Sequence, residues 1–381
     1  MGRCSEAMSV HPILPGFHPD PSICRVGDRY YVANSSFEYF PGVPIFESRE
    51  LLSWQPVGAA LDRPSQLVVR GGMAGANGGV YAPTLRHHDG RFWIATTNIH
   101  EVARGHLIVH AEDPAGPWSE PVYVGGTIGV DPDLAWDEDG VCHLTWSDIV
   151  KGGISQVQIN PLSGDLLSTP QEIWRGTGGA HAEGPHVFAR DGWWYLIAAE
   201  GGTGPGHMVT IARSRAVNGP FEPARNNPIL THRSTALPVQ ATGHGDMVEL
   251  ADGTWAMVHL GIRQRGSFPR WHTNGRETFL VGVDWVDGWP VVDEERFDVS
   301  ETTTSFEDSF PGPALHSRWI SPGAIPAEFA RPQQDGLLLS AGREREQRDA
   351  CRLLATRVAD LTWEAEVDSS DDIALVLRID D

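Results

Sequence analysis

The pattern of apolar and polar residues along the chain predicts many short strands separated by tight turns. A turn followed by an aromatic-rich strand recurs five times. The copies are "VGDRYYVANSS" (26–36), "DGRFWIATTN" (89–98), "DGVCHLTWSD" (139–148), "DGWWYLIAAE" (191–200) and "DGTWAMVHLG" (252–261). Four of the five contain Asp-Gly, which is a strong signal for a tight turn between two strands. The pattern therefore predicts five similar hairpins, spaced by roughly 50–60 residues.

Two further similarities accompany the hairpins in a fixed order, one at all five and one at three of them. A short element precedes every turn, as "DPSI" (20–23), "APTL" (82–85), "DPDL" (131–134), "GPHV" (184–187) and "GDMV" (245–248). A less regular signature, interpreted as an outer strand, ends at Trp54, Trp118 and Phe221. Repeating units of several strands are typical of β-propeller blades. We therefore predict an all-β protein with a five-bladed β-propeller over residues 10–300. The alternative, a β-sandwich with similar hairpins, does not explain a three-part order repeated five times.

Composition narrows the class of protein. The 381 residues include 42 glycines and 28 prolines, which favours strands and turns over long helices. The formal net charge of −21 argues against a nucleic-acid partner, since no basic stripe compensates for it. The four cysteines, Cys4, Cys24, Cys142 and Cys351, follow no metal-binding spacing, and Cys24 and Cys142 are expected to be buried free thiols. No secretory signal or membrane-spanning run is evident, so a cytoplasmic location without membrane association is expected, and a homo-oligomer is compatible with the sequence.

Acidic residues stand where the first strand of several predicted blades begins. In a propeller this strand lies nearest the central axis, so the strand starts of all blades face one end of the channel. The residues at these positions are Asp20, Tyr81, Asp131, Glu183 and the His244/Asp246 pair. The returning strands should rim the same pocket with polar and aromatic residues: Asn34–Phe37, Thr97, Asn98, Ser147, Asp148, Glu200 and His259. Three acids from three blades are therefore expected to converge in one axial pocket.

Converging carboxylates fit glycoside hydrolysis. This reaction needs one protonated carboxyl to protonate the leaving oxygen and one carboxylate to activate water or attack carbon. A third acid can raise the proton affinity of the general acid by like-charge repulsion. Two structural alternatives remain open at this stage, a bound cation or a ring of salt bridges. The scarcity of Lys and Arg near these acids in the sequence weakens the second alternative.

Several motifs resemble glycoside hydrolase family 43, in its β-xylosidase and α-L-arabinofuranosidase branches. They are "ILPGFHPDPSICRVGDRYYVANSSFEYFPGVPIFESRELLSWQPVGAAL", "DPDLAWDEDG", "EGPHVF", "AEGGTGPGHMVTIARS", "GHGDMVE" and "NGRETFL". The resemblance covers about residues 10–300 in uninterrupted order. It implies a five-bladed propeller, an inverting mechanism, no required cofactor, and removal of terminal xylose or arabinofuranose from small oligosaccharides derived from xylan or arabinoxylan.

The resemblance also implies roles for single residues. The general base falls on Asp20, the pKa-modulating acid on Asp131 rather than Asp133, and the general acid on Glu183. Substrate contacts fall on Phe37, Tyr81, His244 and Arg276. Tyr81 stands where many β-xylosidases of the family have Trp, which leaves the choice between xylose and arabinose open. His244 is expected either to bind a structural Ca²⁺, directly or through water, or to fill the channel.

The C-terminal residues 305–381 resemble the start of the β-sandwich module that the family appends to its propeller. Because this module is much longer in the family, we expect it to be incomplete here. A half sandwich leaves unpaired edges and exposed apolar faces. The competing function is therefore a carbohydrate-binding propeller that is inactive without the complete module. A phosphate loop at "EGGTGPGH" (200–207) is disfavoured, because the Lys-Ser/Thr pair and the following helix are missing.

Overall fold

The computed structural model describes residues 10–68, 70, 77–266, 269–334, 336–340, 352–370 and 372–378. Five four-stranded antiparallel sheets, here called blades I to V, make up most of this part of the chain. Blade I contains β1 (Ser22–Val26), β2 (Arg29–Ala33), β4 (Gly42–Ser48) and β5 (Gln55–Leu61). Blade II contains β6 (Thr84–His88), β7 (Arg91–Thr96), β8 (His106–Ala111) and β9 (Val122–Val124), with the 3₁₀ helix η1 (Ile99–Arg104) between β7 and β8.

The other three blades follow the same order along the chain. Blade III contains β10 (Val130–Trp136), β11 (Cys142–Ser147), β12 (Ile154–Ile159) and β13 (Gln171–Trp174). Blade IV contains β14 (Glu183–Arg190), β15 (Trp193–Glu200), β16 (Met208–Ser214) and β17 (Glu222–Pro223). Blade V contains β18 (Val239–Glu249), β19 (Trp255–Arg263), β20 (Glu277–Val286) and β21 (Trp289–Asp293).

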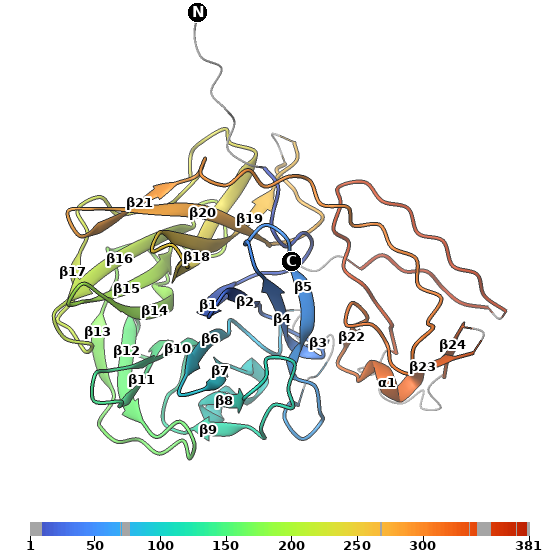
Figure 1. Cartoon of the computed structure of the whole chain (residues 1–381), viewed down its shortest axis with the longest axis horizontal. Helices are drawn as coiled ribbons and strands as arrows, with labels where there is room; N and C mark the ends of the chain where they lie inside the picture. The colour runs from blue at the N-terminus through green and yellow to red at the C-terminus, as the bar shows by residue number, and fades with distance from the viewer. Residues whose placement is uncertain are drawn as a thin grey trace, which may run out of the picture.

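The first strands of the blades form a closed ring. Strand β1 contacts β6 and β18, β10 contacts β6 and β14, and β14 contacts β18. Figure 1 looks along the axis of this ring, with the five first strands around the centre and the later strands of each blade further out. The fold is therefore the five-bladed propeller that the repeats predict, and the sandwich alternative is wrong for this part of the chain.

The repeated hairpins are the first two strands of the five blades. The tight turns at their tips use glycine in the left-handed conformation, as at Gly192 with φ of +72°. The third repeated signature ends just before a fourth strand in blades I, II and IV, where Trp54, Trp118 and Phe221 are buried. Each sequence signature thus marks a definite place in a blade.

Apolar side chains between neighbouring blades make up the core. One cluster joins blades I and V and includes Ile13, Ile23 and Leu280. The backbone of Ile13 and Leu14 pairs with Thr278 of β20 just before the chain enters blade I. The N-terminal segment therefore connects the first blade to the last one, which closes the ring.

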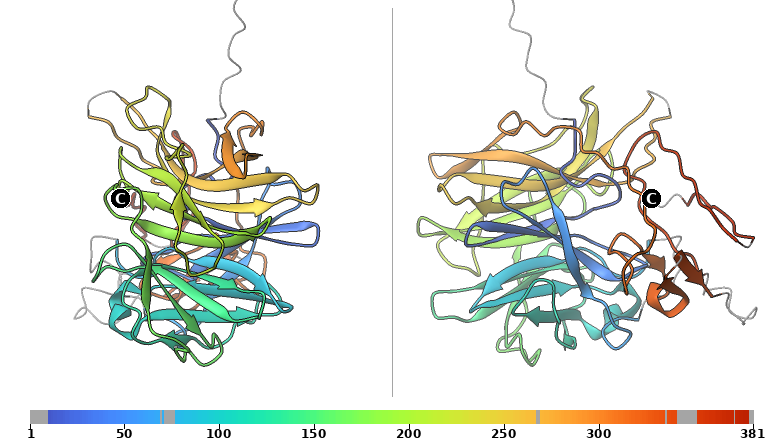
Figure 2. Two further views of the ribbon diagram at one scale, coloured as in Figure 1. Left: turned by 90° about the vertical axis from the view of Figure 1, so that its left-hand side faces the viewer. Right: turned by 45° about the vertical axis from the view of Figure 1, so that its right-hand side comes forward.

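The C-terminal part lies beside blade I (Figures 1 and 2). Strand β22 (Ser321–Pro322) pairs with β3 (Tyr39–Phe40) of the propeller, and helix α1 (Pro326–Phe329) precedes the paired strands β23 (Ala330–Gln333) and β24 (Gly336–Leu339). The segments described over 352–378 contain exposed apolar side chains, such as Leu375 and Val376. The division at residues 300–305 into a propeller and an incomplete sandwich stays a prediction.

Two compositional predictions can be compared with the structure. Cys24 and Cys142 are buried free thiols, as expected, while Cys4 and Cys351 lie outside the described residues. The N-terminal segment 1–9, on which the absence of a secretory signal depends, also lies outside them. Among the residues that the structure describes, no helix has the length and apolar character needed to cross a bilayer.

Candidate active site

Unusual backbone geometry directs the candidate site residues toward the axis. Asp20, Asp131 and His244 have positive φ values of +53°, +54° and +48°. Residues other than glycine adopt this backbone conformation at an energetic cost, and such strained residues cluster at functional sites. Register shifts interrupt the pairing of β10, β14 and β18 beside the site residues of blades III, IV and V. Such bulges re-aim side chains without ending the strand.

Asp20 is buried and surrounded by groups that favour its ionised form. Its Oδ1 accepts a hydrogen bond from Arg276 Nη1 at 2.9 Å and lies 3.7 Å from His244 Nδ1, while its Oδ2 accepts from the Ser35 hydroxyl. Burial raises the pKa of this carboxyl, but Arg276, His244, Ser35 and His207 together outweigh burial and lower it. Asp20 is therefore an ionised carboxylate at neutral pH.

Asp131 and Glu183 have the opposite electrostatic character. Burial raises the pKa of Glu183 to about 7, and the negative charge of Asp20 adds to this effect. Burial also raises the pKa of Asp131, followed by repulsion from Glu183 and Asp20. The backbone N–H of Gly184 donates to Asp131 Oδ2 at 3.0 Å, so these two acids are linked through one peptide group. The structure brings all three sequence-predicted acids into one electrostatically coupled group.

Aromatic rings and Arg276 form a wall beside these acids. The ring centroids of Phe37 and Tyr81 are 5.4 Å apart, and those of Phe17 and Phe37 are 5.7 Å apart. The Arg276 guanidinium carbon lies 5.3 Å from the Phe37 ring centroid. Sequence reasoning identified Phe37, Tyr81 and Arg276 but missed Phe17, although it stands three residues before Asp20 in "GFHPD". Such a wall can stack against the face of a sugar ring.

The C-terminal segment supports this wall from behind. Arg357 Nε donates to the backbone oxygen of Phe17 at 2.7 Å. The backbone oxygen of Ala359 accepts from Arg263 at 2.9 Å and from Asn274 at 3.1 Å. Asn274 lies two residues before Arg276. Part of the region after the propeller therefore contacts two of the segments that supply this wall, those of Phe17 and Arg276.

A second layer of charged residues lies deeper along the propeller axis than the site. This layer was not predicted from the sequence. Arg86 donates to Asp133 Oδ1 at 2.6 Å and to Asp246 Oδ2 at 2.8 Å, and its Nη2 lies 2.9 Å from His186 Nδ1. Ser22 Oγ donates to the same oxygen of Asp246 at 2.7 Å. This buried group, here called the axial ion cluster, takes one or more side chains from every blade.

The two layers are separated at irregular points of the first strands. Asp133 and Asp246 stand two residues after Asp131 and His244, and a register shift falls within each of these two segments. Salt bridges of the kind considered from the sequence are therefore found in the deeper layer, while at the site Asp20 pairs with Arg276. The arginine was missed because Arg86 comes from blade II, far in the chain from both of its partners. The available signal was the arginine that directly follows "APTL", at the start of the second blade.

His244 lies between the two layers, against the segment that contains Glu183 and Gly184. A Cβ on Gly184 would approach its ring to 2.9 Å, which shows how closely the imidazole covers this glycine. Burial lowers the pKa of His244 to about 4. Within the described residues, no group of three or more His, Cys, Asp or Glu side chains is arranged to hold a metal ion. Ca²⁺ takes about six to eight oxygen ligands, and the nearby Asp20 is already engaged by Arg276, so this donor set does not fit a Ca²⁺ ligated directly by protein side chains.

Most residues of the predicted second ring hold backbone segments. Asn34 Nδ2 donates to the backbone oxygens of His18 and Pro19, and Ser147 Oγ donates to that of Ala182. Several others bind neighbouring side chains or turns: Thr97 with His106, Asn98 with the start of η1, Asp148 with the turn at 150–151, and Glu200 with the loop at 177–179. His259 instead stacks on Phe279, with ring centroids 5.8 Å apart.

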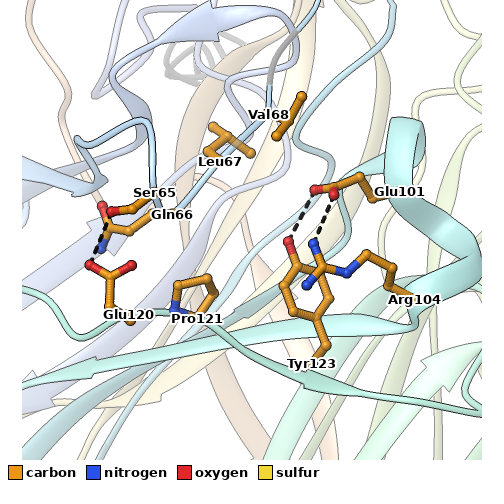
Figure 3. Close-up of a pocket in the computed structure, with 9 residues that line it drawn as sticks. All are labelled: Ser65, Gln66, Leu67, Val68, Glu101, Arg104, Glu120, Pro121 and Tyr123. Atoms are coloured by element: carbon orange, nitrogen blue, oxygen red, sulfur yellow. Dashed lines mark hydrogen bonds and ion pairs between the residues drawn. The ribbon is translucent and has the colours of Figure 1, made fainter.

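The propeller also has a separate cavity of about 230 Å³, and Figure 3 draws the residues that line it. It is lined by Ser65, Gln66, Leu67, Val68, Glu101, Arg104, Glu120, Pro121 and Tyr123. Its charged groups bind other groups of the lining, since Glu101 accepts from Arg104 at 2.8 Å and from Tyr123 at 3.0 Å. None of the sequence-predicted site residues lines this cavity, so it is distinct from the axial site.

The fold and the axial site together define a class, a five-bladed β-propeller with three neighbouring acids at one end of its axis. Within this class, the chain belongs to glycosyl hydrolases family 43, whose family model matches residues 10–290. The resemblance inferred from the motifs is thus confirmed.

Relatives of known name support this membership. The chain is 42% identical over 288 residues to the non-reducing end alpha-L-arabinofuranosidase BoGH43B of Bacteroides ovatus, covering 75% of this chain and 53% of that protein. It is 40% identical over 339 residues to a xylosidase/arabinosidase of Butyrivibrio fibrisolvens, covering 81% and 64%. These curated relatives are therefore considerably longer than the present chain.

Solved structures give the same result. The Bacteroides ovatus xyloglucan PUL GH43B structure matches with a TM-score of 0.83 at 36% identity, covering 92% of this chain and 72% of that one. A xylan beta-1,4-xylosidase from Bacillus halodurans C-125 matches with a TM-score of 0.80 at 35% identity, with the same coverage.

Proposed function

We propose that this protein is a glycoside hydrolase that removes terminal β-D-xylose, α-L-arabinofuranose or both from xylo- or arabinoxylo-oligosaccharides with inversion. The opposite pKa shifts of two neighbouring acids carry this proposal. The pKa of Asp20 is lowered and that of Glu183 is raised to about 7, which suits a general base and a general acid at neutral pH. The printed names of the relatives supply the two candidate sugars.

In the proposed reaction, Glu183 transfers its proton to the glycosidic oxygen while the bond from that oxygen to the anomeric carbon breaks. Asp20 accepts a proton from a water molecule that attacks the opposite face of the same carbon. Asp131 is proposed to act as a coupled acid that shares the raised proton affinity of this group with Glu183, and to orient the Glu183 segment through the Gly184 N–H. In an inverting enzyme, the two catalytic carboxyls are about 6.5–9.5 Å apart to admit this water.

Arg276, Phe37 and Tyr81 are proposed to bind the sugar that is removed. Arg276 offers guanidinium donors to hydroxyls next to Asp20, and the rings offer a stacking face. His244 is proposed to fill the channel beside Gly184 and to border the same pocket. The chemistry assigned to the two carboxyls needs no metal or cofactor, so treatment with EDTA is expected to leave turnover unchanged.

The test compares hydrolysis of an aryl β-xylopyranoside and an aryl α-L-arabinofuranoside by the wild-type protein and the Asp20→Asn variant. Turnover of at least one substrate by the wild type, lost in the variant while the fold is retained, supports the proposal and identifies the sugar. Proton NMR of the first-formed product tests inversion. Binding of oligosaccharide without turnover supports the alternative, a propeller that only binds carbohydrate.

A further inference from the structure

Glu200, the last residue of β15, is a fully buried carboxylate whose hydrogen-bond donors are neutral groups. Its side chain accepts from the backbone N–H of Thr177 at 2.8 Å and of Gly179 at 2.7 Å. It also accepts from the hydroxyls of Thr177 at 3.1 Å and Thr210 at 2.8 Å. Its relative exposure is 0%. A buried carboxylate is costly unless such donors compensate for its lost hydration.

The loop that Glu200 binds fits closely around it. A Cβ on Gly176 would come within 2.8 Å of the Glu200 carboxyl carbon, and one on Gly179 within 2.7 Å of a carboxylate oxygen. Gly176 also has a positive φ of +79°, which favours glycine at this position. The segment 176–179 can therefore wrap the carboxylate only because it lacks side chains at these two positions.

This loop leads into the general-acid strand, and hydrogen bonds also hold the backbone at Ala180, Ala182 and Gly184. The N–H of Gly201 donates to the oxygen of Ala180 at 2.6 Å. Ser147 Oγ donates to the oxygen of Ala182 at 2.9 Å, and the N–H of Gly184 donates to Asp131 at 3.0 Å. Glu183 thus projects from a backbone held on both sides, and Glu200 holds the approach to it.

We propose that Glu200 is a positioning residue for Glu183: its carboxylate fixes the loop at 177–179 so that the Glu183 carboxyl meets the leaving oxygen. This inference rests on the proposed glycosidase function. Glu200 does not contact substrate in this account. It acts through the backbone, by keeping the proton donor in place and shielded from water while the bond to the leaving group breaks.

The experiment uses the different needs of good and poor leaving groups. The 2,4-dinitrophenolate of an aryl glycoside is a good leaving group and departs without being protonated. The sugar that leaves from a disaccharide is a poor leaving group and needs a proton from Glu183. For Glu200→Gln, the expected loss in kcat/KM is about 10-fold or more on the disaccharide and less than about 3-fold on the dinitrophenyl glycoside of the same sugar. Asp137→Asn is the matched control, since Asp137 accepts from the backbone of the turn at 139–141, at the opposite end of the β10–β11 hairpin. It should leave both values unchanged.

A pH profile gives a second readout that a merely structural role would not change. Burial is the main reason for the raised pKa of Glu183, and the charged groups facing it are Asp20, Asp131 and Arg276. If the loop at 177–179 loosens, water reaches Glu183 and burial raises its pKa less. The pKa of Glu183 then falls, and the alkaline limb of the pH profile of kcat/KM moves to lower pH. If Glu200→Gln does not fold, Thr177→Val removes one hydroxyl donor, keeps the backbone N–H, and should change both readouts in the same direction by a smaller amount.

The possible outcomes separate the two proposals. Equal losses on both substrates, or no loss with an unmoved alkaline limb, in an active wild-type background overturn the positioning role alone. A wild-type protein that hydrolyses neither substrate overturns the proposed function and, with it, this inference. A selective loss on the disaccharide with the alkaline limb moved to lower pH supports both.

Discussion

The axial ion cluster should make a large contribution to stability, and Arg86→Met tests it. Arg86 is the cation that binds both Asp133 and Asp246, whose relative exposures are 0% and 1%. Methionine keeps much of the side-chain length but leaves two buried carboxylates without this partner. Removing one member of a buried ion pair typically costs about 3–5 kcal/mol, since the remaining charge stays desolvated.

The size of the effect can be converted into an expected thermal shift. For a domain of this size, a loss of 1 kcal/mol in the free energy of unfolding lowers the melting temperature by roughly 2 °C. The melting temperature of Arg86→Met should therefore lie about 6–10 °C below that of the wild type at pH 7. The exposed pair Arg49–Asp28 offers a matched control, because surface ion pairs contribute about 0–1 kcal/mol. Arg49→Met should change the melting temperature by less than about 2 °C.

The sharper test is how the loss of stability in Arg86→Met, relative to the wild type, depends on pH. In the wild type, burial raises the pKa of Asp246, but Arg86 and His186 outweigh burial and lower it. Its contribution to stability is thus present above its ordinary pKa and is lost as pH falls through the lowered value. Without Arg86, burial dominates and the pKa of Asp246 rises, so this carboxylate takes up a proton at a higher pH.

The deficit of Arg86→Met should therefore be largest near pH 7 and should shrink toward about pH 4.5. Urea unfolding of wild type and variant at several pH values, followed by tryptophan fluorescence, measures it. A difference in unfolding free energy below about 1 kcal/mol at pH 7 would refute the reasoning, as would a deficit that does not change with pH.

Three further predictions concern the site. The pH profile of kcat/KM should be bell-shaped, falling at low pH as Asp20 gains a proton and above about pH 7 as Glu183 loses one; a flat profile from pH 6 to 9 would contradict this assignment. Arg276 lowers the pKa of both Asp20 and Glu183, so Arg276→Met should raise both pKa values and move both limbs of the pH profile to higher pH, while kcat/KM falls about 100-fold. Limbs at their wild-type positions would show that Arg276 does not act on these acids. Gly184→Ala places a Cβ 2.9 Å from the His244 ring at a φ of +55°, so activity should fall at least about 10-fold while the melting temperature changes by only a few degrees; full activity would show that the segment adapts.

The sequence determined the number of blades because a blade is a local unit. One continuous segment contains the turn at Gly192, the aromatic strand after it and the buried Phe221. Five such segments can be recognised in the sequence without knowledge of how they pack together. The acids at the strand starts were also predictable. Propeller geometry puts equivalent positions of all blades at the same end of the axis, which identifies Asp20, Asp131 and Glu183 as neighbours.

Only the tertiary structure decided the depth of each residue and its partner. Asp131 and Asp133 are both acidic and stand two residues apart on β10, yet one interacts with Glu183 and the other binds Arg86. Their separation depends on a register shift within the β10–β11 pairing, which the alternation of side chains does not reveal. Arg86 and Asp246 are 160 residues apart and meet only when the ring closes. The charge that each carboxyl carries follows from these long-range contacts, because burial and neighbouring charges set its pKa, and no local pattern in the sequence contains either of them.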